Sequence, residues 1–260
     1  MTPGNVVCDL DGVVYVGDRP IPGAGDALRA IAASGYRLVL ATNNSTRTPE
    51  AVADRLESLT GYRTDAASVV TSSIAAASML SPADSPAFVV GEAGVVAALG
   101  DAGVEVTDDP LAARSVVVGL ARHVDYPAIR DAATAVRRGA RFVATNTDAT
   151  FPTPDGLVPG AGSIVAAIAT AAGADPEVAG KPHAAIRQAI TERLGAGTTW
   201  AVGDRAETDL ALAAEAGWRR VLVLSGVTAS ADAVPRELAP DLVLATLAEL
   251  PAALAAESGQ

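Results

Sequence analysis

Two aspartates stand two positions apart in the segment CDLDGVVY, at the end of an apolar run. If the extended backbone continues, the side chains of Asp9 and Asp11 point to the same side. Carboxylates held close together raise one another's proton affinity, so that one stays protonated while the other ionises. The segment could therefore supply a nucleophile and an acid, although an ordinary turn with a helix-capping aspartate would contain the same residues.

A second polar stretch, VLATNNSTRT, follows another apolar run and could hold an anion. Thr42 offers a hydroxyl group, and the backbone amides of Asn43 and Asn44 can point at a bound oxyanion. Threonine and asparagine are also common turn residues after a strand. The stretch by itself leaves both interpretations open.

Lys181 is the only lysine of the chain, and the other 18 basic residues are arginines. An ammonium group is a compact point charge with three donors, which suits a phosphate oxygen or a buried carboxylate, whereas a guanidinium group is a broad planar fork. A chain that uses arginine everywhere else and keeps one lysine indicates a functional position for that lysine.

The segment WAVGDRAETD adds two more carboxylates. Asp204 follows an apolar strand, while Asp209 lies in the first turn of the next helix, where an acidic residue also interacts well with the helix dipole. Oxygen ligands from Asp204 and from the Asp9/Asp11 segment would suit Mg²⁺, which prefers octahedral oxygen sites completed by water.

The elements that must position these residues alternate between apolar strands and amphipathic helices. This alternation predicts an α/β fold with a doubly wound, Rossmann-like parallel sheet. Strands are expected at 5–10, 37–44, 198–204, 219–226 and 241–247, helices at 23–35, 48–59 and 207–217, and a turn leading into a helix at 66–80. Thr48 is expected to cap its helix, with Pro49 in the first turn.

A self-contained α/β pattern interrupts this core. SPADSP and GADPEVAGKP read as the outgoing and returning linkers. We therefore predict a core formed by residues 1–80 and 180–260, with a smaller α/β cap domain inserted at 81–179. The segments at 35–50 and 139–155 resemble each other, which we interpret as the general likeness of strand ends; the alternative is that both loops face one cleft.

Composition excludes several classes of protein. The net charge of -11 and the pI of about 4.6 argue against a nucleic-acid partner, which calls for a basic surface. Cys8, the one cysteine, sits in an apolar run and reads as a core thiol. The N-terminus lacks the pattern of a signal peptide, and no apolar run is long enough to cross a bilayer, so we expect a soluble cytoplasmic protein without membrane contact.

Together and in this order, the four motifs resemble the haloacid dehalogenase-like superfamily. The motifs are Asp-x-Asp-Gly, Thr-Asn-Asn, Gly-Lys-Pro after an inserted segment, and Gly-Asp-x-x-x-Thr-Asp. The residues of these motifs are similar to those of the branch of phosphatases with an inserted α/β cap. This branch includes 4-nitrophenyl phosphatases, phosphoglycolate and pyridoxal phosphate phosphatases and the NagD proteins. The cap segment ATNTDATFPTPDGLVPGAGS is similar as well, so the resemblance covers nearly the whole chain.

This resemblance implies a Mg²⁺-dependent phosphatase that acts on a small phosphorylated metabolite. It makes Asp9 the nucleophile that becomes an aspartyl phosphate, and Asp11 the acid that protonates the leaving oxygen and later activates water. The remaining roles are phosphoryl binding by Thr42, Asn43, Asn44 and Lys181, metal binding by Asp9, Asp11 and Asp204, and support of Lys181 or of a metal-bound water by Asp209. A homodimer through the cap is a further expectation.

The chain departs from the branch at two positions. Glu207 stands where the branch often has aspartate, and we expect it beside the site. Phe151 stands where relatives that recognise pyridoxal phosphate or phosphoglycolate tend to place histidine, so the resemblance does not establish those substrates. Asn146 and Asp148 remain candidate polar contacts from the cap, or simply stabilise its loop.

Two alternatives use the same motifs. In a phosphotransferase or mutase, the aspartyl phosphate passes to a second hydroxyl group. In a phospho-acceptor signalling module, the phosphorylated aspartate itself is the output, but such a module is one compact domain and would not carry an inserted cap. A dehalogenase is disfavoured because its chemistry has no use for an acid at Asp11 or a metal at Asp204.

Overall fold

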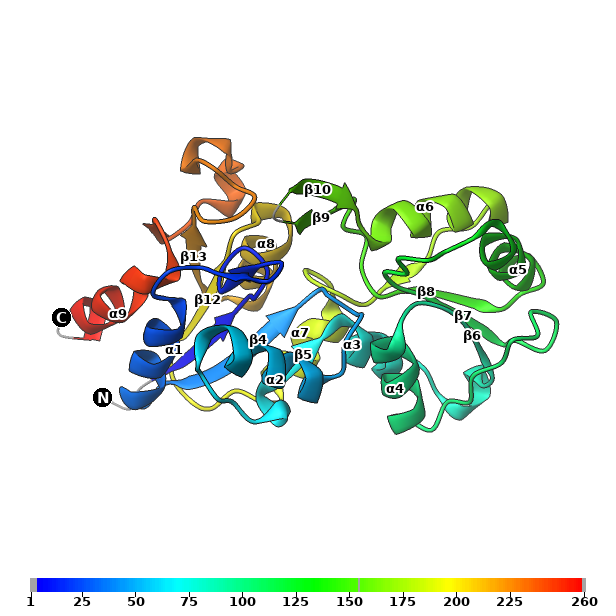
Figure 1. Cartoon of the computed structure of the whole chain (residues 1–260), viewed down its shortest axis with the longest axis horizontal. Helices are drawn as coiled ribbons and strands as arrows, with labels where there is room; N and C mark the ends of the chain where they lie inside the picture. The colour runs from blue at the N-terminus through cyan, green and yellow to red at the C-terminus, as the bar shows by residue number, and fades with distance from the viewer. Residues whose placement is uncertain (1–3, 154, 259–260) are drawn as a thin grey trace.

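The computed structural model describes residues 4–153 and 155–258, so residues 1–3 of the N-terminal segment considered above lie outside the described part. Within the described residues, six parallel strands form the central sheet in the order β14-β13-β12-β1-β4-β5 (Figure 1). The strands are β1 Asn5–Cys8, β4 Arg37–Thr42, β5 Val69–Thr71, β12 Thr199–Gly203, β13 Arg219–Val223 and β14 Leu242–Leu244. The chain steps outward from β1 in one direction and from β12 in the other, so the strand order reverses between these two central strands.

Helices cover both faces of this sheet, because its central strands are apolar on both sides. Val6 and Cys8 pack on one face with helices α1, α2 and α9, whereas Val7 packs on the other face with α3, α7 and α8. The bounds are α1 Ala24–Ala33, α2 Pro49–Thr60, α3 Ser72–Ser78, α7 Ala184–Thr191, α8 Ala211–Ala216 and α9 Leu250–Ser258. Thr48 caps α2 as predicted, its hydroxyl accepting the N–H of Ala51.

A second parallel sheet forms the smaller α/β cap, whose residues lie in the sequence between the two halves of the core. Its order is β11-β8-β7-β6 among the described residues, and α5 and α6 pack on one of its faces. The bounds are β6 Ala87–Val90, α4 Ala93–Asp101, β7 Ser115–Val118, α5 Tyr126–Arg137, β8 Arg141–Ala144, α6 Ala161–Ala172 and β11 Glu177–Val178. This is the predicted fold class. The division at 1–80, 81–179 and 180–260 is retained as a proposal.

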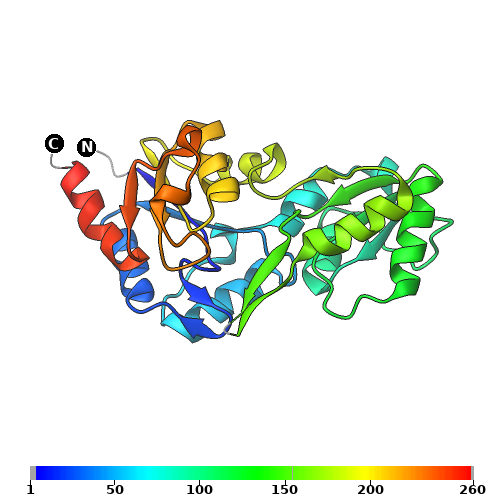
Figure 2. The same cartoon turned by 90° about the horizontal axis from the view of Figure 1, so that it is seen from above.

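Two antiparallel hairpins complete the fold near the junction of the cap and the core. The cap hairpin β9 Thr150–Thr153 and β10 Gly156–Pro159 extends from the cap toward the core in both ribbon views (Figures 1 and 2). The core hairpin β2 Tyr15–Val16 and β3 Arg19–Pro20 follows directly after the Asp9/Asp11 segment.

Some of the predicted elements were wrong. The turn expected at 66–80 contains strand β5, and the returning linker contains strand β11. Both strands are only two or three residues long, too short for an apolar period to show. Tertiary pairing with β4 and β8 creates them.

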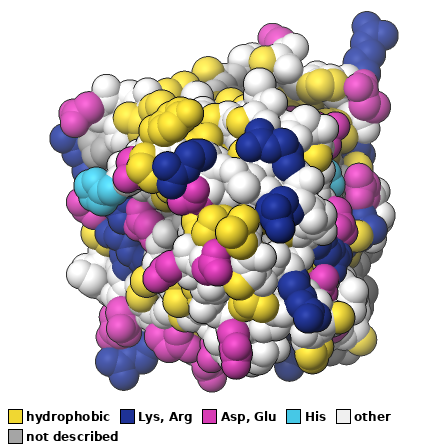
Figure 3. Space-filling view, turned by 90° about the vertical axis from the view of Figure 1, so that its right-hand side faces the viewer, with side chains coloured by type: hydrophobic (Ala, Val, Ile, Leu, Met, Phe, Trp, Pro, Cys, Tyr) yellow, Lys and Arg dark blue, Asp and Glu magenta, His cyan; other side chains and the backbone are white. Residues whose placement is uncertain are grey.

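The surface of the cap end mixes charges of both signs. Figure 3 shows acidic and basic side chains interleaved on this face, around small hydrophobic areas. Among the described residues, none of the helices combines the length and the apolar character that crossing a membrane would require.

The cap and the core share one hydrophobic cluster. Val39 of the central sheet and Leu99 of α4 both belong to it, and α4 lies against the core helix α3. Gly94 of α4 permits this approach: a Cβ added there would lie 2.5 Å from the carbonyl oxygen of Ser45 and 2.6 Å from that of Arg47. The backbone N–H of Gly94 donates to the carbonyl of Thr46 across the same contact.

A pair of glycine substitutions in α4 tests this contact. Gly94→Ala should lower the free energy of unfolding by about 1–3 kcal/mol, because the added methyl group has to push the cap away from the core. Gly100→Ala, in the same helix with no atom within 4 Å of the added Cβ, should raise it by about 0.5–1 kcal/mol through helix propensity alone. Urea denaturation of both variants measures the difference. A stabilising Gly94→Ala would show that the contact is not tight.

Candidate active site

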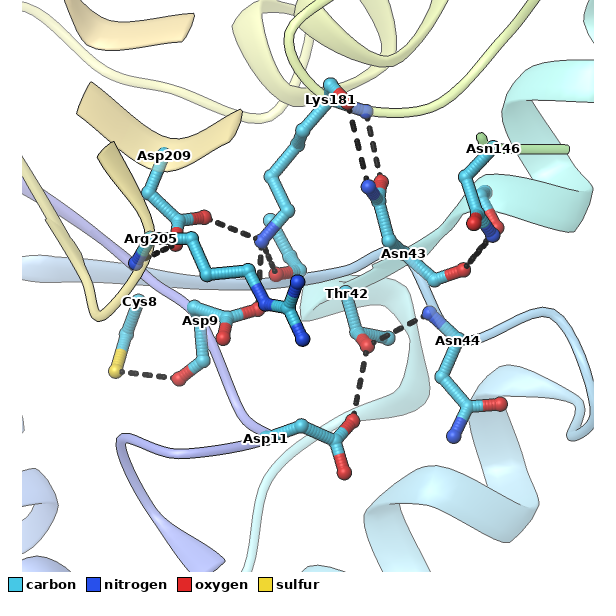
Figure 4. A network of polar contacts seen from close by, with 12 residues as sticks. Cys8, Asp9, Asp11, Thr42, Asn43, Asn44, Asn146, Lys181, Arg205 and Asp209 are labelled. Atoms are coloured by element: carbon cyan, nitrogen blue, oxygen red, sulfur yellow. Dashed lines mark hydrogen bonds and ion pairs between the residues drawn. The ribbon is translucent and has the colours of Figure 1, made fainter. Parts of the chain in front are cut away.

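The predicted residues meet at the carboxyl edge of the central sheet, beside the point where the strand order reverses. Asp9 and Asp11 follow β1, Thr42 ends β4, and Lys181 returns from the cap (Figure 4). Asp204 follows β12. A cavity of about 50 Å³ lies among Asp9, Asp11, Thr42 and Lys181, and Asp204 is not part of its lining. Its lining contains Asp9, Asp11, Thr42, Asn43, Asn44, Leu120, Asn146, Asp148, Thr150, Phe151, Pro152, Gly160, Ala161, Lys181, Arg205, Thr208 and Asp209.

Lys181 is buried, with a side chain only 4% exposed, and its ammonium group has three acceptors. Nζ donates to Asp9 Oδ1 at 2.6 Å, to Asp209 Oδ1 at 2.6 Å and to the carbonyl oxygen of Ala41 at 3.1 Å. These acceptors match the three donors of an ammonium group. The only lysine of the chain therefore holds two carboxylates together inside the site.

The charge of Lys181 is preserved by its neighbours. Burial by itself lowers the pKa of Lys181, but the carboxylates of Asp209 and Asp9 outweigh this effect and raise the pKa above its ordinary value. Burial raises the pKa of Asp9, and Lys181 opposes that shift. With a contact of 2.6 Å between them, we take the pair as ionised at neutral pH.

Asp204 is the carboxylate without a full set of partners. Its Oδ2 accepts the backbone N–H of Val227 at 2.6 Å, whereas Oδ1 is buried and has no hydrogen-bond partner in the described part of the chain. Burial, with the nearby charge of Asp209, raises the pKa of Asp204 to about 6. Gly12 makes room for this group: its φ is +90°, and a Cβ there would lie 2.4 Å from Asp204 Oδ2.

The donor set fits a divalent cation. Asp9, Asp204 and Asp209 each offer a carboxylate oxygen, all within 4.8 Å of one another. Asp209 is already engaged, since Oδ1 accepts from Lys181 and Oδ2 from the backbone N–H of Arg205 at 3.1 Å. Three carboxylates against one ammonium group leave negative charge to be neutralised, and the oxygens of Asp9 and Asp204 remain for a hard cation.

Asp11 lies across the cavity beside Thr42. Thr42 Oγ1 is 3.5 Å from Asp11 Oδ2 and accepts the backbone N–H of Asn44 at 3.0 Å. Burial raises the pKa of Asp11, and the more distant cations, Lys181 first, oppose that shift. The environment of Asp11 thus favours retention of a proton more than that of an exposed aspartate does.

Asn43 joins the core to the cap rather than aiming its side chain at the cavity. Its Oδ1 accepts the backbone N–H of Lys181 at 2.7 Å, and its Nδ2 donates to Asp148 Oδ2 at 3.1 Å. Asn146 Nδ2 donates to the carbonyl oxygen of Asn43 at 2.7 Å. Asn146 and Asp148 therefore stabilise the loop junction while also lining the cavity.

Three expectations from the sequence need revision or addition. The two similar segments are both strand ends, after β4 and β8, as we interpreted them, and the loops that follow also line one cavity, as the alternative proposed. Glu207 is exposed and outside the cavity lining, because the π-helical turn Ala206–Leu210 points it outward. Arg205 was missed: it lines the cavity and donates to the carbonyl oxygen of Thr150 in the cap hairpin at 3.3 Å. Its position directly after Asp204, a predicted site residue, could have indicated that Arg205 lies at the site.

Comparison with known proteins gives consistent matches along the chain. Residues 6–105 match the sequence profile described as haloacid dehalogenase-like hydrolase, and residues 178–250 match one described as HAD-hydrolase-like. Dihydroxyacetone phosphatase from Corynebacterium glutamicum is 35% identical over 247 residues, which cover 93% of this chain and 88% of that protein.

Solved structures share the fold over almost the whole chain. NagD from Escherichia coli has a TM-score of 0.84 at 33% identity, covering 96% of this chain and 98% of that one. The glycerol phosphate phosphatase from Mycobacterium tuberculosis in complex with magnesium has a TM-score of 0.85 at 33% identity, covering 96% of this chain and 76% of that one.

Replacement of Lys181 by an uncharged residue of similar length should destabilise the fold. Lys181→Met leaves two buried carboxylates without their cation, so we expect the free energy of unfolding at pH 7 to fall by about 3–5 kcal/mol. The raised pKa of Lys181 means that its stabilising contribution is complete below its ordinary value of 10.5 and is lost only as the pH rises above it. The loss in the variant should shrink as the pH falls, because burial raises the pKa of Asp9 and lets that carboxyl group accept a proton.

Urea denaturation at pH 7 and at lower pH, in the presence of a chelator, measures the free energy of unfolding of the variant and the wild type. Arg130→Met, which removes the exposed partner of Asp131, is the control and should have a much smaller effect. Wild-type stability in Lys181→Met at pH 7 would contradict the assignment of a buried charged triad.

Proposed function

The chain belongs to the haloacid dehalogenase-like hydrolases, and on that premise we propose that it is a Mg²⁺-dependent phosphomonoesterase that works through an aspartyl phosphate on Asp9. The chain is a phosphoric monoester hydrolase, as its named relatives indicate. The observation that carries the mechanism is the contact of 2.6 Å between Lys181 Nζ and Asp9 Oδ1, inside a cavity that Asp11 also lines.

Asp9 is placed to be the nucleophile. Lys181 binds Oδ1 and thereby keeps the carboxylate ionised and fixed in orientation, while Oδ2 has no hydrogen-bond partner among the described residues. In the first step, an oxygen of Asp9 forms a bond to phosphorus as the bond from phosphorus to the ester oxygen breaks. The covalent intermediate divides a very slow hydrolysis into two easier steps.

Asp11 is placed to move the proton in both steps. Its carboxyl group gives a proton to the departing alcohol oxygen, which leaves as the neutral alcohol. The resulting carboxylate then takes a proton from water as the water oxygen attacks phosphorus, and the bond from phosphorus to Asp9 breaks. The products are the alcohol and inorganic phosphate, and both carboxyl groups return to their starting states.

Positive charge and hydrogen-bond donors surround the phosphoryl position. The Lys181 ammonium and the Thr42 hydroxyl group lie on the cavity wall, where they stabilise charge on the phosphoryl oxygens. The N–H of Asn44 is bonded to Thr42 Oγ1, so the proposed role of Asn44 in phosphoryl binding is to orient that hydroxyl group. The backbone amide of Asn43 completes the proposed phosphoryl contacts.

The proposed metal ligands are Asp9, Asp204 and the backbone carbonyl of Asp11. The unpartnered Oδ1 of Asp204 and the surplus negative charge of the site support a cation there, and a related glycerol phosphate phosphatase has been solved with magnesium. Bound Mg²⁺ supplies charge neutralisation for the transferring phosphoryl group. Asp209 stabilises Lys181 and the Arg205 backbone instead of binding the metal, since both of its oxygens have protein partners.

The substrate is proposed to be a small phosphorylated metabolite, because the cavity is small and residues of both the core and the cap loop line it. The cytoplasmic location and the homodimer through the cap stay predictions.

Removal of the nucleophile tests the mechanism. Asp9→Asn should lower kcat for 4-nitrophenyl phosphate by about 10⁴-fold or more, since the covalent route is lost. Asp11→Asn should lower it by about 10²–10⁴-fold, the usual contribution of a general acid. Phosphate release in excess Mg²⁺ measures both, with Arg138→Ala on the exposed surface as the control. Retained activity in Asp9→Asn would overturn the assignment of the nucleophile.

A matched pair of aspartate substitutions tests the metal site. The folded pKa of Asp204, about 6, lies above its ordinary value of 3.8, so its ionisation costs stability as the pH rises through 6. Without metal at pH 7, Asp204→Asn should therefore raise the free energy of unfolding by about 1–3 kcal/mol, a gain that disappears at pH 4. Asp209→Asn should lower it, because Lys181 loses one of its two carboxylates.

Addition of Mg²⁺ should reverse the ranking of wild type and Asp204→Asn. The wild type gains stability through linkage to binding, whereas Asp204→Asn gains little. Thermal unfolding with a chelator and then with millimolar Mg²⁺ measures the gain. An equal Mg²⁺-dependent gain in both proteins would exclude Asp204 as a ligand.

A further inference from the structure

A second cavity of about 240 Å³ adjoins the catalytic one. The two cavities share Asp11, Asn44, Leu120 and Phe151 in their linings. The other lining residues of the second cavity are Tyr15, Gly17, Asp18, Thr46, Arg47, Arg55, Arg122 and Thr153. Since Asp11 is the proposed acid, the oxygen that leaves phosphorus has to lie beside the boundary between the two cavities, and the second cavity is the space beyond it.

Three arginines line this second cavity, in a chain whose net charge is -11. Two of them have protein partners. Arg55 pairs with Asp18 and lies over the ring of Tyr15, and Arg122 pairs with Glu92. The third, Arg47, has neither a hydrogen bond nor an ion pair from its guanidinium group among residues 4–153 and 155–258.

The loop that carries Arg47 is fixed on both sides. Thr46 donates its N–H and its hydroxyl to Asn44 Oδ1, and the carbonyl of Thr46 accepts from Gly94 of the cap. Arg47 itself is partly exposed at the wall of the cavity. An unpaired guanidinium group on a fixed loop, with five donors in a planar fork, is a binding site for carboxylate or phosphate oxygens.

We propose that the second cavity receives the alcohol part of the substrate and that Arg47 binds a second anionic group on that alcohol. This inference rests on the proposed phosphatase function and narrows its substrate class to phosphomonoesters whose alcohol carries a carboxylate or a further phosphate. Leu120 and Phe151 supply apolar surface for the few carbon atoms between the two anionic groups. A volume of 240 Å³ lies below the roughly 300–1,000 Å³ of sites for drug-sized ligands, which limits the alcohol to a small one.

Matched pairs of esters test the proposal on the wild-type protein with Mg²⁺. 3-Phosphoglycerate and glycerol 3-phosphate have the same carbon skeleton and differ in a carboxylate against a hydroxymethyl group. We expect kcat/KM to be about tenfold or more higher for 3-phosphoglycerate, the size of effect that a charge-assisted hydrogen bond gives. The second pair is propane-1,3-diol bisphosphate and propane-1,3-diol monophosphate. A higher kcat/KM for the bisphosphate would show that a phosphate is accepted in place of a carboxylate.

Variants of Arg47 separate binding from a structural role. Arg47→Ala should bring the kcat/KM ratio within a pair close to one, mainly through KM of the anionic ester. Arg47→Lys should keep part of the preference, because it keeps the charge without the fork. Arg138→Ala, an exposed arginine of the cap, should leave the ratio unchanged. A merely structural Arg47 would lower both kcat/KM values together and preserve the ratio.

The outcomes distinguish failure of this inference from failure of the proposed function. Suppose that the protein hydrolyses 4-nitrophenyl phosphate in an Asp9-dependent reaction, but that the kcat/KM ratio of the wild type is near one within both pairs of esters. This result would overturn the role of Arg47 and leave the proposed phosphatase function intact. A preference that survives in Arg47→Ala would also overturn it. If Arg47→Ala does not fold, Arg47→Gln and the wild-type ratios decide the question. Absence of any ester hydrolysis would overturn both proposals.

Discussion

One ammonium group among three buried carboxylates is the interaction on which the site depends. Lys181 Nζ binds Asp9 and Asp209 at 2.6 Å each, while one oxygen of Asp204 has no hydrogen-bond partner among the residues that the structure describes. Burial of so many like charges is costly unless they are paired, so the arrangement is held by the rest of the fold. The charge that Lys181 leaves uncompensated is what favours a divalent cation, and the same ammonium group fixes the proposed nucleophile.

The parallel sheet explains how four distant segments reach one place. Because β1, β4 and β12 are adjacent and run in the same direction, Asp9, Thr42 and Asp204 all emerge at one edge. The segment that returns from the cap brings Lys181, the fourth contribution to the site. The cap shares a hydrophobic cluster with the core, and Asn43 ties its loop to Lys181. The packing that joins the cap to the core therefore also sets the position of the lysine.

Two adjoining cavities fit the proposed division of a phosphomonoester. The smaller cavity is lined by Asp9, Asp209 and Lys181 and suits the phosphoryl group. The larger cavity is lined by three arginines and suits the alcohol, and two apolar side chains line both cavities. Asp11 lies at their boundary, where a proton has to pass to the leaving oxygen. In a chain that is acidic as a whole, the proposed role of the basic side chains at this place is to bind a second charged group of the substrate.

The sequence by itself determined the fold class, because apolar periods and helix-capping residues such as Thr48 are local signals. It also singled out candidate site residues, the single Lys181 among them, from their types and spacing. It did not determine that both oxygens of Asp209 are bonded to Lys181 and Arg205, that Glu207 points outward, or that the loops after β4 and β8 face one cleft. Nor did it determine that Arg47 has no hydrogen bond or ion pair with another described residue. Each of these depends on which groups approach across long separations in the chain. Short strands such as β5 and β11 were missed for the same reason, since pairing with a neighbouring strand, and not their own residues, makes them strands.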